Sequence, residues 1–357
     1  MSSDNMISEG KAKATVNGVF YNPRMKFCRD FDIAVFRAIH EKERMVRYLD
    51  ALSASGIRGI RACLEAGYDV SFNDIDERAV ETIKRNLELN GIEAEVYNKD
   101  ANILMREKRF FHIDIDPFGS PAEFIDSACI YPKYLSVTAT DTSALCGSST
   151  ASGLRKYGVF AVKTEYYPEV GLRALIGRIF NESAKYDKAV RVLVAFAKEH
   201  FYRVHIEFRR SPNAVKRTFS KYGYLFHCPK CLRRYHVRIG EGMDKCECGE
   251  KMIMIGPLWL GELHDQNFVE KLESDEKEVS RYINLIRGEI QTPFFYDLHH
   301  ITKKLNTSPP KLDSVIEALR ELGYSASRTR FSGTSFKTDA DISEIGRVIM
   351  DLKSQPS

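Results

Sequence analysis

Short apolar runs alternate with longer amphipathic stretches between residues 46 and 210, and this alternation restricts the fold more than any other feature of the chain. The runs cover residues 46–52, 69–72, 94–97, 110–115 and 134–139. Strands that alternate with helical segments predict a parallel sheet covered by helices. Two further runs, 190–197 and 203–208, are close enough in sequence to form an antiparallel hairpin. We therefore predict a Rossmann-like α/β sheet that is parallel and finishes with a C-terminal hairpin.

Four of the five predicted parallel strands end at or beside an acidic residue. These residues are Asp50, Asp74, Asp100 and, at the fourth run, Asp114 with Asp116. Ligands of open α/β sheets bind outside the carboxyl ends of the strands, which meet at one edge. Each acid taken alone could equally be a helix cap or a turn residue. Their recurrence at successive strand ends predicts a binding site along this edge.

The composition is that of a globular protein. The chain has 357 residues, 43% of them hydrophobic and 29% charged, which is enough for two or three domains with cores of their own. Its first 30 residues carry charges throughout, and no apolar run approaches the roughly 20 residues of a membrane span. We expect a cytoplasmic protein with no membrane partner, and no obligate protein partner is evident.

The fourth strand run leads into the octapeptide Asp-Ile-Asp-Pro-Phe-Gly-Ser-Pro at 114–121. An exocyclic base amine is a poor nucleophile, because its lone pair is delocalised into the ring. Acceptors for its two N–H bonds favour the pyramidal geometry that attack on a methyl group requires, and a stacked aromatic ring fixes the base. Asp116, the Pro117 carbonyl and Phe118 are candidates for these functions. The alternative is a strand that simply ends in a proline turn.

The first strand run leads into a loop of small residues, Ser53 to Gly56, and then into a predicted helix. The segment lacks the glycines that a dinucleotide pyrophosphate requires, but it suits S-adenosylmethionine, which has no phosphate. Arg58 or Arg29 is a candidate partner for the cofactor carboxylate, and Asp50 for its ammonium group.

The next two strands supply candidates for the nucleoside half of that cofactor. Asp74 lies where a carboxylate accepts hydrogen bonds from ribose hydroxyls, and Ile75 follows it. Asp100 and Ala101 end the third strand and would face the adenine amine. Asp76 is as well placed to cap the following helix as to bind a ligand.

Four cysteines form two close pairs, Cys228 with Cys231 and Cys246 with Cys248, fourteen residues apart. Two such pairs on short turns are typical of a closed, structural Zn(II) site with four thiolates, as in zinc ribbons. The competing interpretation is a pair of disulfides, as found in intracellular proteins of hyperthermophiles. We expect the flanking His227 and His236 to be surface residues rather than ligands.

The segment from 203 to 238 is strongly basic. It has ten lysines and arginines against one acid, Glu207. The cations are Arg203, Arg209, Arg210, Lys216, Arg217, Lys221, Lys230, Arg233, Arg234 and Arg238, and the interleaved aromatics are Phe208, Phe219, Tyr222, Tyr224, Phe226 and Tyr235. Basic charge with stacking groups indicates nucleic-acid binding, although a solvated basic face is the simpler alternative.

The C-terminal part has a different pattern of apolar residues. Residues 267–287, 294–305 and 312–322 show helical periodicity, and 324–338 alternates as a hairpin does. The pattern predicts a small α+β, winged-helix-like domain with Arg328, Arg330 and Lys337 on its wing, available for nucleic acid. The alternative is a module that only packs against the rest of the chain. We divide the chain into a sheet domain at 1–212, a cysteine-rich insert at 213–262 and a C-terminal RNA-binding domain at 263–357.

Several of these segments together resemble one family. Residues 20–25, 50–61, 73–75, 114–121, 138–141 and 256–261 resemble the tRNA guanine-26 N2-dimethyltransferases, and the likeness covers nearly the whole chain. The resemblance implies transfer of one and then two methyl groups from S-adenosylmethionine to a guanine N2 in tRNA. It implies cofactor contacts from Phe20, Arg29, Arg58, Asp74, Asp100 and Ala101, and an action of Asp116 on the amine.

Two other functions stay open on the residues alone. The same Asp-Pro-Phe geometry could serve adenine N6 in DNA or RNA. A nucleic-acid-binding protein whose sheet domain has lost its cofactor is the non-enzymatic alternative. The resemblance favours guanine in tRNA, because the block that matches the family extends beyond Asp-Pro-Phe to Gly-Ser-Pro.

Overall fold

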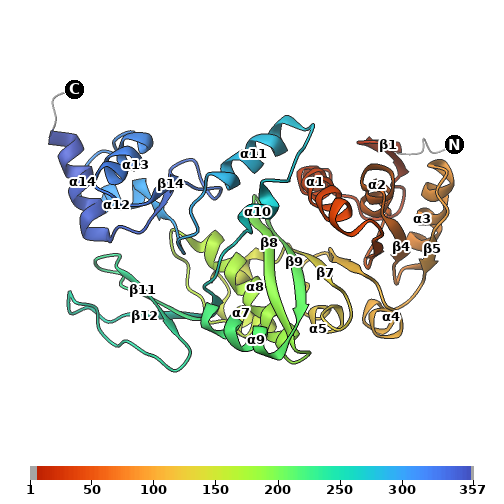
Figure 1. Cartoon of the computed structure of the whole chain (residues 1–357), viewed down its shortest axis with the longest axis horizontal. Coiled ribbons are helices and arrows are strands. Elements are labelled where there is room, and N and C mark those ends of the chain that lie inside the picture. Colours follow the sequence, from red (N-terminus) through yellow and green to blue (C-terminus); the bar gives the residue numbers. More distant parts are fainter. Residues whose placement is uncertain (1–5, 355–357) are drawn as a thin grey trace.

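The computed structural model describes residues 6–354, and a seven-stranded mixed sheet forms its centre (Figure 1). The strand order is β5-β4-β3-β6-β7-β9-β8. The strands are β3 (Arg47–Asp50), β4 (Asp69–Asn73), β5 (Glu95–Tyr97), β6 (His112–Ile115), β7 (Tyr134–Ala139), β8 (Lys188–Lys198) and β9 (Phe201–Arg210). The first five pair in parallel, and β9 pairs antiparallel with both β7 and β8. The predicted parallel sheet with a terminal hairpin is confirmed.

Helices cover both faces of the sheet, because its strands are apolar on both sides. Tyr48 points into a core shared with α1 (Lys26–Glu43), α2 (Ile57–Ala66) and α3 (Glu77–Leu89), whereas its neighbour Leu49 points into the opposite core. That second core contains α4 (Ala101–Glu107), α5 (Ile125–Ala128) and α8 (Tyr167–Ala184). The period-2 alternation of β3 thus divides its side chains between two cores.

Shorter elements complete the sheet domain. They are β1 (Met6–Glu9), β2 (Ala12–Thr15), α6 (Thr142–Leu145), α7 (Thr150–Tyr157) and α9 (Pro212–Thr218), with 3-10 turns at Pro23–Met25 and Phe219–Lys221. Among the described residues, no helix combines the length and the apolar character needed to cross a membrane.

The cysteine-rich segment is built on a separate three-stranded sheet. Its order is β11-β10-β12, from β10 (Tyr222–His227), β11 (Arg234–Arg238) and β12 (Ile253–Trp259). The C-terminal sheet has the order β13-β15-β14, from β13 (Tyr296–Asp297), β14 (Ala326–Arg328) and β15 (Ser335–Thr338). With α12 (Leu298–Lys304), α13 (Leu312–Glu321) and α14 (Ile342–Ser354) it encloses a core of its own, at the upper left of Figure 1. This arrangement is consistent with a winged-helix-like domain.

The predicted helix over 267–287 is broken into α10 (Gln266–Val269) and α11 (Lys277–Arg287). The Arg287 guanidinium explains the break, because it donates to the backbone carbonyls of Val269 (3.3 Å), Glu270 (3.2 Å) and Leu272 (2.6 Å). Side-chain donors of this kind satisfy the free carbonyls at a helix end. Both helices pack into the core that contains α1. They therefore belong structurally with the sheet domain.

Two of the three cations predicted for the wing are buried, so this part of the prediction is wrong. Arg330 is 5% exposed and Lys337 is 1% exposed. Arg330 pairs with Glu289 (2.9 Å), and Lys337 pairs with Glu289 and with Glu169 of α8 (3.1 Å each). A buried charge needs a partner, and here the partners join the C-terminal domain to the sheet domain. Arg328 is partly exposed and bonds Asp313 (2.8 Å).

Candidate functional site

The octapeptide 114–121 begins in β6 and continues as a loop at the carboxyl edge of the sheet. Gly119 has φ +98, a conformation that side-chain-bearing residues rarely adopt. Its N–H donates to Thr140 Oγ1 (2.8 Å), and its carbonyl accepts from the Thr140 N–H (2.9 Å). The loop is thereby fastened to the residues that follow β7, which fixes the backbone around Asp116 to Phe118.

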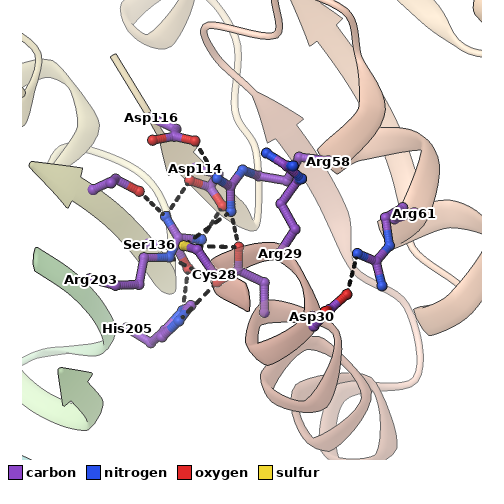
Figure 2. Close-up of polar contacts among 12 residues, drawn as sticks. Cys28, Arg29, Asp30, Arg58, Arg61, Asp114, Asp116, Ser136, Arg203 and His205 are labelled. Carbon is purple, nitrogen blue, oxygen red and sulfur yellow. Dashed lines mark hydrogen bonds and ion pairs between the residues drawn. The ribbon is translucent and has the colours of Figure 1, made fainter. Parts of the chain in front are cut away.

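The Asp116 side chain is held by Arg58, as Figure 2 shows. Arg58 lies in the first turn of α2, is 5% exposed, and also bonds Asp32 of α1. The two carboxylates therefore share one guanidinium. The Asp116 side chain remains 22% exposed, whereas that of Asp32 is fully buried. Asp116 is consequently the member of this group that a ligand can reach.

Asp114, two residues earlier, is directed into the protein instead. Its two oxygens accept from Arg203 Nη1 (2.8 Å) and Nη2 (2.6 Å), and Arg203 Nε donates to Asp32 (2.9 Å). Both side chains of the Asp114–Arg203 pair are 0% exposed. Burial raises the pKa of Asp114, but the charges of Arg203 and Arg58 and the hydrogen bonds from Arg203 together outweigh it, so that the pKa is lowered overall. These buried contacts indicate a structural role for Asp114.

Phe118 and Phe20 form an exposed aromatic pair beside Asp116. Phe118 is 86% exposed and Phe20 is 57% exposed. Their ring centroids are 5.5 Å apart with an interplanar angle of 68°. Large apolar side chains exposed together mark interaction sites more often than structural ones. The face of Phe118 is open for stacking by a flat ligand.

The loop between β3 and α2 is shaped by two glycines. Gly56 adopts φ +76 at the start of the helix, and a Cβ on Gly59 would lie 2.4 Å from the Phe72 ring. Asp50 is 3% exposed, and its Oδ2 accepts from the Gly59 N–H (3.1 Å). Burial raises its pKa well above the usual range, and the charges of Asp114 and of Asp116 add to the effect. Asp50 therefore lies behind the loop in this structure, and contact with an ammonium group stays a prediction.

The other strand-end acids hold backbone N–H groups. Asp74 accepts from Ala54 N (2.9 Å) and from Asp76 N (3.0 Å). Asp76 caps α3 through Arg78 N (3.0 Å), which settles its predicted capping role. Asp100 caps α4 by accepting from Asn102 N (2.7 Å) and Ile103 N (3.2 Å). These bonds place the acids along one edge, while their ligand contacts stay predictions.

Exposed aliphatic side chains lie beside two of these acids. Ile75, directly after Asp74, is 70% exposed, and Ile103, in the first turn of α4, is 54% exposed. Ala101 is buried. A purine ring is flat and apolar on its faces, so exposed aliphatic groups next to hydrogen-bonding acids fit a bound nucleoside.

Arg29 has a carboxylate partner within the protein. Its Nε and Nη2 donate to the two oxygens of Glu9, at 2.7 and 2.5 Å, and Nη2 also donates to the Asn22 carbonyl (3.2 Å). A cofactor carboxylate at Arg29 would have to join Glu9 or displace it.

The four cysteine sulfurs lie within 4.8 Å of one another. Cys228 and Cys248 approach to 3.5 Å, as do Cys231 and Cys246. Zn–S bonds of about 2.3 Å in a tetrahedron place sulfurs roughly 3.8 Å apart, whereas a disulfide requires about 2.05 Å. The four free thiols therefore fit a closed structural zinc site, and the disulfide alternative does not describe this structure.

The basic segment is only partly a surface. Arg203 is fully buried with Asp114, and the rings of Phe208, Tyr222 and Phe226 are buried as well. The exposed cations are Arg209, Arg210, Lys216, Arg217, Lys230 and Arg238, and Phe219 is the aromatic of this segment with large exposure (43%). His227 is also buried, contrary to the sequence prediction, whereas His236 is exposed as predicted.

Sequence reasoning did not identify Asp32 and Glu9 as the buried partners of the site arginines. Asp32 lies inside the apolar helix run of α1, and its bonds to Arg58 and Arg203 link both halves of the site. A carboxylate within an apolar helical stretch is itself a signal, because it must find a buried partner. The identity of that partner depends on the tertiary fold.

A family model described as N2,N2-dimethylguanosine tRNA methyltransferase matches residues 3–350. The tRNA (guanine(26)-N(2))-dimethyltransferase of Archaeoglobus fulgidus is 51% identical over 349 residues, covering 97% of this chain and 99% of its relative. The enzyme of the same name from Methanosarcina mazei is 39% identical, covering 94% and 92%.

One solved structure covers the whole architecture. It is Trm1 from Pyrococcus horikoshii in complex with S-adenosyl-L-methionine, with 35% sequence identity and a TM-score of 0.87, and the match covers 96% of this chain and 99% of that chain. The present chain thus belongs to the N2,N2-dimethylguanosine tRNA methyltransferase family.

Proposed function

We propose that this protein transfers one and then two methyl groups from S-adenosylmethionine to the exocyclic N2 of guanine 26 in tRNA. The observation that carries the proposal is the grouping of Asp116, Pro117 and the exposed Phe118 on a fixed loop at the carboxyl edge of the sheet. The relatives named above, which match over almost their entire length, support it.

Each residue of the tripeptide has a distinct task. The flipped guanine stacks on Phe118, and its amine donates to the Asp116 carboxylate and the Pro117 carbonyl. Both acceptors draw electron density toward nitrogen and favour its pyramidal form, in which the lone pair is less delocalised into the ring. Arg58 fixes the Asp116 carboxylate from behind. It is therefore a positioning residue for the acceptor.

The same set of groups suits two successive transfers. In each transfer a nitrogen–carbon bond forms, the sulfur–carbon bond of the methyl donor breaks to leave a thioether, and the amine gives one proton to the Asp116 carboxylate, which releases it to solvent. After the first transfer the amine still carries one N–H, which can donate to Asp116 in the same way. The second transfer thus needs no residue beyond those that serve the first.

The cofactor is assigned to the adjacent edge. Asp74 would accept from the ribose hydroxyls and Asp100 from the adenine amine, with Ile75 and Ala101 beside the purine. Phe20 would close the site from the side of Phe118. The methionine end is assigned to Asp50, Arg58 and Arg29, of which Figure 2 labels the two arginines. The bound cofactor supplies an electrophilic methyl group on a sulfonium.

The proposed substrate explains the additional parts of the chain. A guanine at the junction of two tRNA stems must leave its stack to reach Phe118, at a cost of a few kcal/mol. Contacts to the phosphate backbone can offset that cost. The exposed cations of residues 209–238 and the C-terminal domain are the candidates for such contacts, and a structural zinc at the four cysteines would order the first of them. A tRNA substrate is consistent with a cytoplasmic protein.

The test is incubation with labelled S-adenosylmethionine and an unmodified tRNA transcript, followed by nucleoside analysis. We expect N2-methylguanosine first and N2,N2-dimethylguanosine later, at position 26. Asp116→Ala should abolish transfer while cofactor binding persists in calorimetry. Glu77→Ala, which removes an exposed acid from the first turn of α3, is the matched control and should stay active.

Two results would redirect the proposal. N6-methyladenosine as the product would move the substrate assignment to adenine. Failure of the wild-type protein to bind S-adenosylmethionine would revive the non-catalytic alternative.

A further inference from the structure

A basic pocket of about 530 Å³ lies at the opposite edge of the sheet from Asp116. Its lining includes Arg109 and Lys133, which precede β6 and β7, Lys188 at the start of β8, and Arg210 at the end of β9. Asp116, by contrast, follows the carboxyl end of β6. The pocket is therefore separate from the proposed methyl-transfer site.

Lys188 is the unusual member of this lining. It is only 6% exposed, and its Nζ donates to the Pro132 carbonyl (2.8 Å) and lies 5.1 Å from the centroid of the Phe208 ring. In the described part of the chain it forms no ion pair with a carboxylate. Burial lowers the pKa of Lys188 to about 8, and the charge of Arg210 lowers it in the same sense. Lys188 and Arg210 are paired across β8 and β9, so the ammonium group is buried next to another cation.

The remaining charges of the lining do not neutralise the pocket. Lys133 bonds Glu43 (2.6 Å) and Lys185 bonds Asp126 (2.8 Å), so both of these cations are already matched. Arg109 stacks on the Tyr131 ring at 5.0 Å and, within residues 6–354, pairs with no acid. Arg109, Lys188 and Arg210 accordingly face a pocket whose lining contains a single carboxylate, that of Asp187.

A buried, unmatched cation beside a second cation is unfavourable unless an anion joins them. A phosphate group suits the donors, because guanidinium groups bind its oxygens in pairs and an ammonium group adds a point charge. The volume lies within the range of about 300–1,000 Å³ that is usual for ligand pockets. We propose that this pocket binds a phosphate group, at a site distinct from that of methyl transfer.

The phosphate can come from two sources. Arg210 is continuous along the chain with exposed Arg209, and α9 then adds the exposed cations Lys216 and Arg217. This extension favours a backbone phosphate of the tRNA. A free phosphate compound would use the pocket alone.

The experiment uses Lys188→Met, which removes the charge and keeps the length of the side chain. Arg210→Gln is the second variant, at an exposed position where the fold is not at risk. Arg85→Gln removes an exposed charge from α3 and serves as the control. Inorganic pyrophosphate is titrated by calorimetry, and tRNA transcript is titrated at several salt concentrations.

Wild type and the control should bind one pyrophosphate per chain, and both pocket variants should bind it at least tenfold more weakly. If the phosphate belongs to tRNA, both pocket variants should also bind tRNA more weakly, with the slope of log K against log salt reduced by about one. Unchanged tRNA affinity together with lost pyrophosphate binding assigns the pocket to a free phosphate compound. Equal binding of both probes by all four proteins overturns the proposal. These affinities are measured without turnover, so their outcome is independent of whether the chain methylates guanine.

Discussion

The two aspartates of the octapeptide give a sharp test, because they are two residues apart and differ in environment. The side chain of Asp114 is 0% exposed and that of Asp116 is 22% exposed. We predict that Asp114→Asn destabilises the protein and that Asp116→Asn inactivates it without destabilising it. Each substitution removes one negative charge and is nearly isosteric.

The contacts of Asp114 determine the size of the first effect. Both of its oxygens accept from Arg203, and Oδ2 also accepts from the Tyr48 hydroxyl (3.1 Å). Asparagine must turn an NH₂ group toward one of these donors, so at least one charge-assisted bond is lost and a donor is left unsatisfied. Breaking a buried ion pair costs about 3–5 kcal/mol. At roughly 2–4 °C per kcal/mol, the melting temperature falls by about 6–20 °C.

Asp116 leaves a balanced group of charges when it is removed. Arg58 keeps Asp32, and Arg203 keeps Asp114. We therefore expect a change in the free energy of unfolding within about 1 kcal/mol. Because Arg58 would hold the asparagine oxygen, the amine of the substrate would meet the NH₂ donor in place of an acceptor, so kcat should fall by at least about 100-fold.

Thermal melts and single-turnover methylation of tRNA are measured on both variants and on wild type. The reasoning fails if Asp114→Asn melts with wild type, or if Asp116→Asn melts as early as Asp114→Asn does. A fully active Asp116→Asn variant would remove this carboxylate from the proposed chemistry.

Further predictions concern the stacking of the base on Phe118, the zinc site, the pH dependence of stability and the ion pairs that join the C-terminal domain to the sheet domain. Phe118→Ala should lower kcat/KM about 5- to 150-fold in steady-state kinetics, because stacking of a base on an aromatic ring contributes about 1–3 kcal/mol. Cys231→Ser should reduce bound zinc from about one per chain to none in metal analysis. Burial lowers the pKa of His112 to about 3, so between about pH 6.5 and 3 this imidazole is protonated in the unfolded chain but neutral in the folded one. The melting temperature should therefore fall as pH drops from about 6.5 toward 3. His112→Gln should flatten that profile. Arg330→Met leaves Glu289 with Lys337 alone and should cost about 3–5 kcal/mol in denaturant unfolding, with earlier proteolytic release of the C-terminal domain.

Local patterns were sufficient for much of the fold. Strand runs that alternate with helical stretches have one common solution, and the hairpin at the end of the sheet follows from a short connection between two runs. The cysteine spacing likewise predicted four sulfurs in one cluster, since a tetrahedral site requires two close pairs. Asp76 was correctly considered as a cap, because helix starts have local signatures.

The failures share a physical cause. Arg203, Arg330 and Lys337 look like surface cations in sequence, because nothing nearby in the chain reveals a buried partner. Their partners Asp114, Glu289 and Glu169 are far away in sequence, and only tertiary contact brings them together. The broken helix at 270–276 has the same origin, in the contacts of Arg287 with distant carbonyls.

Local periodicity was enough to predict which chemical groups stand at the carboxyl edge of the sheet, because it marks the strand ends and parallel strands end at one edge. The sequence by itself also placed Asp116, Pro117 and Phe118 on one loop. Which of these groups a ligand can reach depends on the folded chain, because burial and charge pairing involve residues remote in sequence. The tertiary structure directs Asp114 inward to Arg203, ties Asp116 to Arg58 and leaves the ring of Phe118 exposed.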